Sequence, residues 1–181
     1  MKKPRLALHD LHQRHPGLTP ALAASYREAA CVCFDRHHRS PILLRLETED
    51  EWDLASEVLV RWPRSDERTL AAWANEIDTT EAAAYAVILA AVELISGLVA
   101  IGRAETLTGA DYYLAPAGTA LEDFENCYRL EISGLDRAPD SAVRRRLEQK
   151  LAQAARGQSQ LPALAGVVGF DAKLILISRL D

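Results

Sequence analysis

The chain has little of what usually marks a secreted protein. Its three cysteines are too few for a dense disulfide framework. The basic residues at positions 1–5 are not followed by the apolar segment that a signal peptide needs. We therefore expect a cytoplasmic protein whose cysteines stay reduced.

An excess of positive charge is also missing. Lysine and arginine number 21 against 26 aspartate and glutamate, which gives a formal net charge of -5. Simple nucleic-acid binders usually carry a basic excess, so composition argues mildly against nucleic acid as a partner. It does not exclude a protein that confines its basic residues to one groove. The 49% of apolar and 26% of charged residues exclude wholesale disorder.

No internal repeat, low-complexity tract or uninterrupted membrane-length apolar run is present. The longest apolar stretch, residues 82–101, is interrupted by Glu93, Ser96 and Gly97. This pattern favours a buried helix that runs into a strand over a membrane span, so no membrane partner is expected. A length of 181 residues suits one compact unit.

Periodicity and capping residues predict a mixed α/β fold. An N-terminal annex over residues 1–78 is expected to contain a helix and a β-hairpin, and a core over residues 79–181 to follow it. Asp78 is expected to open a long helix and Asp140 to cap a later one. The predicted elements are a helix from 20, strands at 42–46 and 57–62, helices at 67–76 and 81–96, strands at 98–104, 111–114 and 128–133, a helix at 140–155 and a strand at 173–177.

Two acids fall where neighbouring strands could bring them together. Asp111 begins one predicted strand, and Glu131 lies inside the next, on the face opposite Leu130 and Ile132. Two carboxylates on adjacent strands can hold a divalent cation, which could activate water and stabilise charge on a phosphate. The plainer alternatives are that Asp111 only begins a strand and that Glu131 faces solvent or pairs with Arg129 or Arg103.

The segments Gly109-Ala-Asp-Tyr-Tyr and Arg129-Leu-Glu-Ile-Ser-Gly resemble the PD-(D/E)xK motif of the restriction-endonuclease-like superfamily. The resemblance covers roughly residues 80–180. It implies a core of helix, three strands, helix and strand, with nuclease activity dependent on Mg²⁺ or Mn²⁺. It also implies that Asp111 and Glu131 are metal ligands, with Glu93 as an additional acid.

Ser133 departs from that motif because it stands where the family has a catalytic lysine. Lys150 or Lys173 could replace that lysine. Two interpretations follow: a metal-dependent nuclease acting on nucleic acid, or an inactive nuclease-like scaffold that binds a protein partner or another copy of itself. A place in a bacterial antiviral defence system is expected by analogy only.

Two other groups of residues permit alternative interpretations. Arg144, Arg145, Arg146 and Lys150 form a basic helix surface that is either solvated or in contact with phosphates. The segment from Cys31 through His38 contains zinc-ligand residue types, but the spacing of its two cysteines is poor for a metal site.

Overall fold

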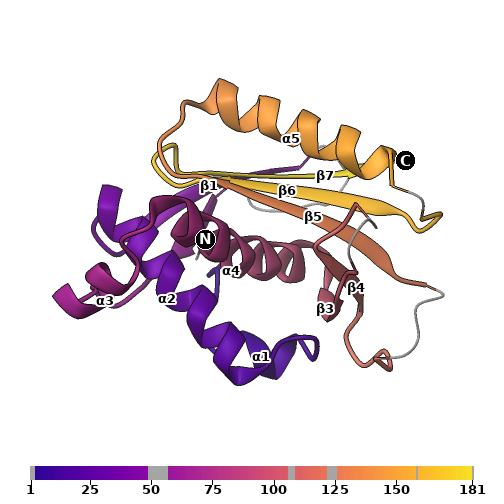
Figure 1. Cartoon of the computed structure of the whole chain (residues 1–181), viewed down its shortest axis with the longest axis horizontal. Helices are drawn as coiled ribbons and strands as arrows, with labels where there is room; N and C mark the ends of the chain where they lie inside the picture. Colours follow the sequence, from indigo (N-terminus) through magenta and orange to yellow (C-terminus); the bar gives the residue numbers. More distant parts are fainter. Residues whose placement is uncertain (1–2, 49–56, 106–108, 122–125, 158, 181) are drawn as a thin grey trace.

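The computed structural model of the chain describes residues 3–48, 57–105, 109–121, 126–157 and 159–180. These residues form a seven-stranded mixed sheet with helices on both faces (Figure 1), which confirms the predicted mixed α/β class. The helices are α1 (Leu11–Arg14), α2 (Pro20–His37), α3 (Glu67–Ala72), α4 (Glu76–Ser96) and α5 (Asp140–Ala155). The strands are β1 (Ile42–Thr48), β2 (Glu57–Val60), β3 (Leu98–Arg103), β4 (Tyr112–Pro116), β5 (Tyr128–Leu135), β6 (Ala163–Gly169) and β7 (Leu174–Leu180).

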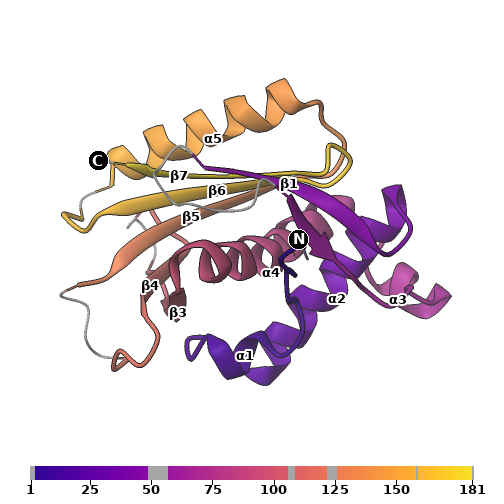
Figure 2. The ribbon, with the colours of Figure 1, turned by 180° about the vertical axis from the view of Figure 1, so that it is seen from behind.

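The helices divide between the two faces of the sheet. Helix α5 covers one face, while α4 lies against the other, with α2 packed on it (Figure 1). Seen from behind, the β1–β2 hairpin lies beside β7 (Figure 2). The chain therefore has three layers, with the sheet in the middle.

The strands run in the order β2-β1-β7-β6-β5-β4-β3. The predicted hairpin of β1 and β2 is confirmed as an antiparallel pair. Strand β1 also pairs in parallel with β7, so the N-terminal strands extend the sheet that the C-terminal half builds. From α4 to β6 the order is helix, three strands, helix and strand. The β3–β4 and β4–β5 pairs are antiparallel and the β5–β6 pair is parallel.

The sequence predictions were wrong about β6, about the start of α4 and about Asp140 as the cap of α5, although α5 spans the predicted residues 140–155. Strand β6 was missed, although all of its residues are buried. Helix α4 begins at Glu76, because the side chain of Asn75 accepts hydrogen bonds from the backbone N–H groups of Ile77 and Asp78. Asp140 makes no cap hydrogen bond. Its carboxylate instead accepts from Arg45 at 2.6 Å.

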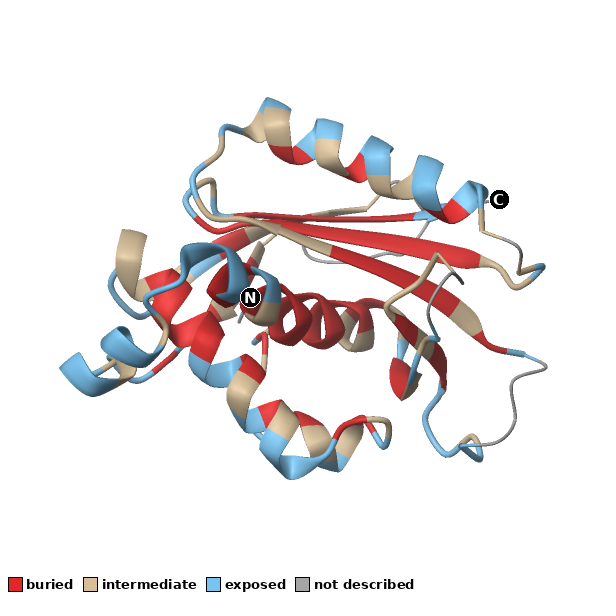
Figure 3. Ribbon diagram, in the orientation of Figure 1, coloured by how far each residue is buried: buried red, intermediate tan, exposed pale blue. Residues whose placement is uncertain are grey.

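Helix α4 supplies much of the hydrophobic core. Its turns from Thr79 to Val92 are almost entirely buried between the sheet and α2 (Figure 3). By length and composition alone α4 could cross a membrane, yet most of its apolar window is buried inside the protein. Burial of residues 83–92 explains why the middle of the helix lacks a polar face.

The outer strands of the sheet are partly covered by the N-terminal segment. On β2, Leu59 exchanges backbone hydrogen bonds with Pro4 and Leu6. On β3, the Ala100 N–H donates to His15 Nδ1, and the Ala100 carbonyl accepts from the Gly17 N–H. Both edges therefore have central backbone groups already paired.

Candidate functional site

Glu131 is a buried acid in the middle of β5. Its side chain is 4% exposed and faces α5, as strand alternation predicts. One carboxylate oxygen, Oε2, accepts from Lys150 Nζ at 2.8 Å, and the other, Oε1, accepts from Gln153 Nε2 at 3.2 Å. Lys150 and Gln153 lie one turn apart on α5, so one helix face supplies both partners.

Burial raises the pKa of Glu131 above its ordinary value. The hydrogen bond and charge of Lys150 act against this rise, while the negative charge of Asp111 adds to it. Asp111 and Glu131 line one common hollow, so their negative charges act on each other. Glu131 is therefore a more basic carboxylate than one in water.

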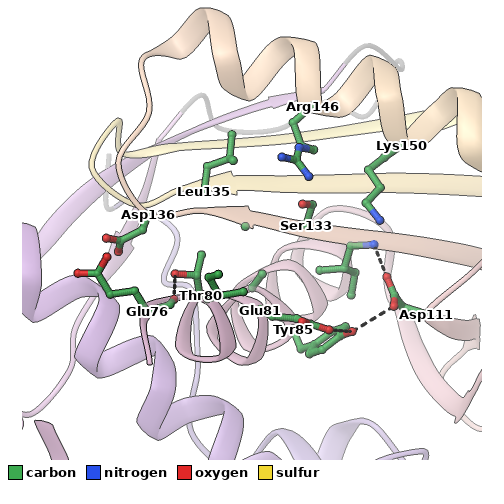
Figure 4. A pocket seen from close by; sticks show the side chains of 14 residues that line it. Glu76, Thr80, Glu81, Tyr85, Asp111, Ser133, Leu135, Asp136, Arg146 and Lys150 are labelled. Atoms are coloured by element: carbon green, nitrogen blue, oxygen red, sulfur yellow. Dashed lines mark hydrogen bonds between the residues drawn. The ribbon is translucent and has the colours of Figure 1, made fainter. Parts of the chain in front are cut away.

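Asp111 lies at the point where β4 and β5 stop pairing. The two strands are in register from Tyr112 to Leu114. Just before this stretch, Asp111 Oδ2 accepts from the Ile132 N–H at 2.7 Å, and Oδ1 accepts from the Tyr85 hydroxyl at 3.1 Å (Figure 4). The carboxylate thus satisfies a backbone donor of β5 that β4 no longer reaches.

Tyr85 connects Asp111 to a cation. Arg103, at the end of β3, donates to the Tyr85 hydroxyl at 2.9 Å and lies 3.8 Å from Asp111 Oδ1. Its guanidinium carbon lies 4.5 Å from the centre of the Tyr85 ring and 4.9 Å from that of Tyr112, in cation–π range. Burial raises the pKa of Tyr85, so its hydroxyl stays protonated and can donate to Asp111.

Two hollows meet at these residues. The central hollow, of about 500 Å³, is lined by Asp111, Ser133, Arg146 and Lys150 among others (Figure 4). A side hollow of about 720 Å³ is lined by Glu131, Gln153 and Arg103, and also by Asp111 and Lys150. Because Asp111 and Lys150 border both hollows, a ligand in either one can reach them.

The structure brings together most of the predicted site residues. Asp111, Glu131 and Lys150 all line the side hollow, and Ser133 lines the central hollow two residues along β5 from Glu131. Of the two candidate lysines, Lys150 is in contact with Glu131. Lys173 lies instead in the turn between β6 and β7, with φ at 52°.

Glu93 is not brought to this site. It lies two turns beyond Tyr85 on α4, where Arg14 Nε donates to it at 2.8 Å and His15 Nε2 at 3.2 Å. Burial alone would raise the pKa of Glu93, but the hydrogen bonds from His15 and Arg14 lower it below its ordinary value. These contacts attach α1 to α4, which is a structural role.

Two other acids of α4, Glu76 and Glu81, line the central hollow, and sequence reasoning missed both of them together with Tyr85 and Gln153. Glu81 lines the central hollow, and its Oε1 lies 3.3 Å from the Tyr85 hydroxyl. The available signals were spacings: Glu81 and Tyr85 are four residues apart, and Gln153 follows Lys150 by three.

The three arginines of the basic α5 surface point to three different places: an ion pair, the solvent and the central hollow. Arg144 donates to Glu47 at 2.6 Å, and Arg145 is exposed. Arg146 turns towards the central hollow, above Ser133 (Figure 4). Only part of this surface therefore faces the site.

The two cysteines of the 31–38 segment are core residues. Cys31 and Cys33 are buried in α2, where burial raises the pKa of Cys31 to about 11 and that of Cys33 to about 12. A cysteine must be a thiolate to bind zinc, and burial in α2 disfavours the thiolate form of both cysteines.

The donor set at Asp111 and Glu131 suits a hard cation. Each carboxylate oxygen has one protein donor and therefore keeps lone-pair capacity for a further contact. Within the described residues, no three histidine, cysteine or acidic side chains cluster as a metal site. Mg²⁺ does not require such a cluster, because it is commonly held by one or two carboxylates together with waters and substrate phosphates.

Comparison with known proteins identifies no matching family model, no matching curated protein and no matching solved structure.

Proposed function

We propose that the protein is a metal-dependent phosphodiesterase acting on nucleic acid, with a restriction-endonuclease-like core. Asp111 and Glu131 would hold Mg²⁺ or Mn²⁺, and Lys150 would replace the cation that Ser133 does not provide. The observation that carries the proposal is the 2.8 Å contact between Lys150 Nζ and the buried Glu131 beside Asp111.

The order and direction of the elements support this proposal. Helix α4, antiparallel β3, β4 and β5, helix α5 and parallel β6 follow the order that the sequence resemblance implies. Asp111 precedes the second of these strands and Glu131 lies in the third. Many α/β proteins share parts of this order, so the argument depends on the site.

Lys150 has the capacity for a second role. Its ammonium group has three donors, of which one is used by Glu131 and another reaches Gln153 Oε1 at 3.4 Å. The third is available to an oxygen of a bound phosphate, where a fixed positive charge would stabilise the developing negative charge. Arg146, which lines the same hollow, could contact a neighbouring phosphate.

A divalent cation would supply Lewis acidity and a more acidic bound water. In the hydrolysis itself, the oxygen of water forms a new bond to phosphorus, and the bond to one ester oxygen breaks. The products are a phosphate monoester and an alcohol. The protein orients these groups through carboxylates fixed by Tyr85, the Ile132 N–H and Gln153.

The test is calorimetric titration of Mn²⁺ into the wild type, Glu131→Gln and Glu148→Gln, with DNA and RNA cleavage measured on the same samples. Glu148 is an exposed acid on α5 and provides the control for loss of one negative charge. Glu131→Gln should abolish metal binding and cleavage, whereas Glu148→Gln should retain both. Metal binding that survives Glu131→Gln would exclude Glu131 as a ligand.

The second candidate is an inactive scaffold that recruits a protein partner or a second copy of the chain. The observation in its favour is that the protein itself satisfies Glu131 and Asp111, through Lys150, Gln153 and Tyr85. Under this alternative, Mn²⁺ would not bind to the wild type and neither nucleic acid would be cut. Binding without cleavage would indicate a metal site that has lost its catalytic function.

A further inference from the structure

A third hollow, of about 700 Å³, lies at the C-terminal end of α2. We call it the basic hollow. It is lined by Asp35, Arg36, His37, His38, Arg39, Ser40, Trp62 and Arg64. Three arginines and two histidines thus face one acid in a protein whose formal net charge is -5. Such a local excess of cationic side chains contrasts with the negative net charge of the whole chain.

Each acidic side chain of this region already contacts a donor or a basic group, although Asp136 Oδ2 is buried without a hydrogen bond from the described residues. Asp35 accepts from Trp62 Nε1 and from the Ser65 N–H, each at 2.7 Å. Asp136, just outside the hollow, accepts from Arg36 at 3.3 Å and His37 at 3.1 Å. Asp171, which is largely exposed, lies 3.9 Å from His37 Nδ1.

Two of the arginines lack such partners. Arg39 and Arg64 are exposed, and neither forms a hydrogen bond or ion pair with another residue that the structure describes. Arg36, by contrast, is held by Asp136 and by the Trp73 carbonyl. The hollow therefore combines a fixed wall with two free guanidinium groups, which suit bidentate contacts to phosphate oxygens.

The basic hollow adjoins the central hollow through Asp136. That residue lines the central hollow and binds Arg36 and His37 of the basic one. Asp136 directly follows the last residue of β5 and is five residues from Glu131, or about 16 Å for extended chain. In double-stranded DNA, successive base pairs are about 3.4 Å apart, so this distance corresponds to roughly five base-pair steps.

We infer that the basic hollow is a second phosphate-binding site, through which Arg39 and Arg64 hold the backbone of a nucleic acid whose scissile phosphate lies in the central hollow. The inference rests on the proposed function for the identity of its ligand. It adds an anchoring site remote from the carboxylates, which fixes the register of the nucleic acid without contacting the reacting atoms.

The experiment measures binding in EDTA, so that cleavage does not interfere. A fluorescent DNA duplex of about 15 base pairs, long enough to reach both hollows, is titrated with the wild type and with Arg39→Ala/Arg64→Ala. The control is Arg5→Ala/Arg145→Ala, which removes the same charge from two exposed arginines outside the hollow. Arg39→Ala/Arg64→Ala, the hollow variant, should bind DNA about tenfold or more weakly than the control. The slope of log affinity against log salt concentration, the salt slope, should fall by about 2 relative to the control.

A small diester, bis(4-nitrophenyl) phosphate, then separates the two proposals. It is too short to reach the basic hollow, so the hollow variant should hydrolyse it at the wild-type rate. If the wild type hydrolyses neither substrate but still binds DNA through Arg39 and Arg64, the phosphodiesterase proposal fails and the anchoring site stands. Equal affinity and salt slope in the two double variants would overturn the anchoring site. So would tight binding of inorganic phosphate to the hollow without DNA binding, which would indicate a small-molecule ligand.

Discussion

At the scale of the residue, the pairing of Glu131 with Lys150 is costly to break, because the carboxylate of Glu131 is buried. Lys150→Met would leave the carboxylate of Glu131, which is 4% exposed, without its cation. We expect a loss of about 3–5 kcal/mol of unfolding free energy, measured by urea denaturation at neutral pH. The control, Arg145→Met on the exposed side of α5, should stay close to the wild type.

The double variant Glu131→Gln/Lys150→Met tests the cause of that loss. It removes the buried charge together with its partner, so it should be more stable than Lys150→Met alone. A double variant that is no more stable would indicate that the lost packing of the lysine stem is responsible, and not the unpaired carboxylate.

The contributions of Glu131 and Glu93 to the free energy of unfolding should change with pH in opposite directions. The pKa of Glu131 is raised by folding, so its contribution to stability is present below the ordinary glutamate value and decreases as pH rises through the raised value. The pKa of Glu93 is lowered, so its contribution is present above the ordinary value and is lost as pH falls through the lowered one.

Glu93→Gln should therefore cost about 1.5–3 kcal/mol at neutral pH, where charged hydrogen bonds from Arg14 and His15 are lost. Its difference from the wild type should shrink as pH falls below about 4. Urea denaturation across this pH range measures both effects, with Glu148→Gln as a surface control. A difference that stays constant with pH would contradict the assignment.

At the scale of the element, the sequence and the structure place the cap of α4 at different residues, Asp78 and Asn75. Asn75→Ala should destabilise the protein by about 1 kcal/mol, because the side chain of Asn75 accepts two backbone hydrogen bonds. Asp78→Ala, at the cap that the sequence suggested, should have a smaller effect. Thermal unfolding of the two variants provides the comparison, and a larger effect at Asp78 would favour the original prediction.

Strand β6 shows why some elements escape sequence analysis. Its residues are Ala-Leu-Ala-Gly-Val-Val-Gly, with small side chains and two glycines that weaken the strand signal. The structure explains Gly166, because a Cβ there would collide with the side chain of Ile88 on α4. Local propensity does not reveal such a requirement, which arises only when the helix and the sheet pack together.

Gly166→Ala should therefore destabilise the protein by about 1–3 kcal/mol through overpacking. Gly102→Ala on β3 is the matched control, since a Cβ at Gly102 meets no atom within 4 Å. Equal stability of the two variants, measured by thermal unfolding, would show that Ile88 moves aside without cost.

The candidate site was predictable only in part, for a similar reason. Strand alternation and the sequence motif indicated Asp111 and Glu131, because both depend on local sequence. Whether Lys150 or Lys173 would approach them depended on how α5 packs on the sheet. Sequence reasoning named Glu93 and did not consider Glu81, because which acid of α4 reaches the site depends on which turn of the helix passes the end of β4.

At the scale of the whole molecule, the pairing of β1 with β7 joins the N-terminal and C-terminal halves. All three tryptophans lie before residue 79, whereas α4 and α5 supply much of the far-ultraviolet circular dichroism. We expect tryptophan fluorescence and circular dichroism to report the same urea midpoint, as in a two-state transition. Separate midpoints would indicate that residues 1–78 and 79–181 unfold as independent domains.

The covered edges of the sheet limit how copies of this protein can associate. Backbone groups of Leu59 on β2 and of Ala100 on β3 are already bonded to the N-terminal segment. A neighbouring molecule cannot add its own strand at either place without first displacing that segment. A dimer or filament that keeps the N-terminal segment in place would therefore not continue the sheet from one subunit into the next through Leu59 or Ala100.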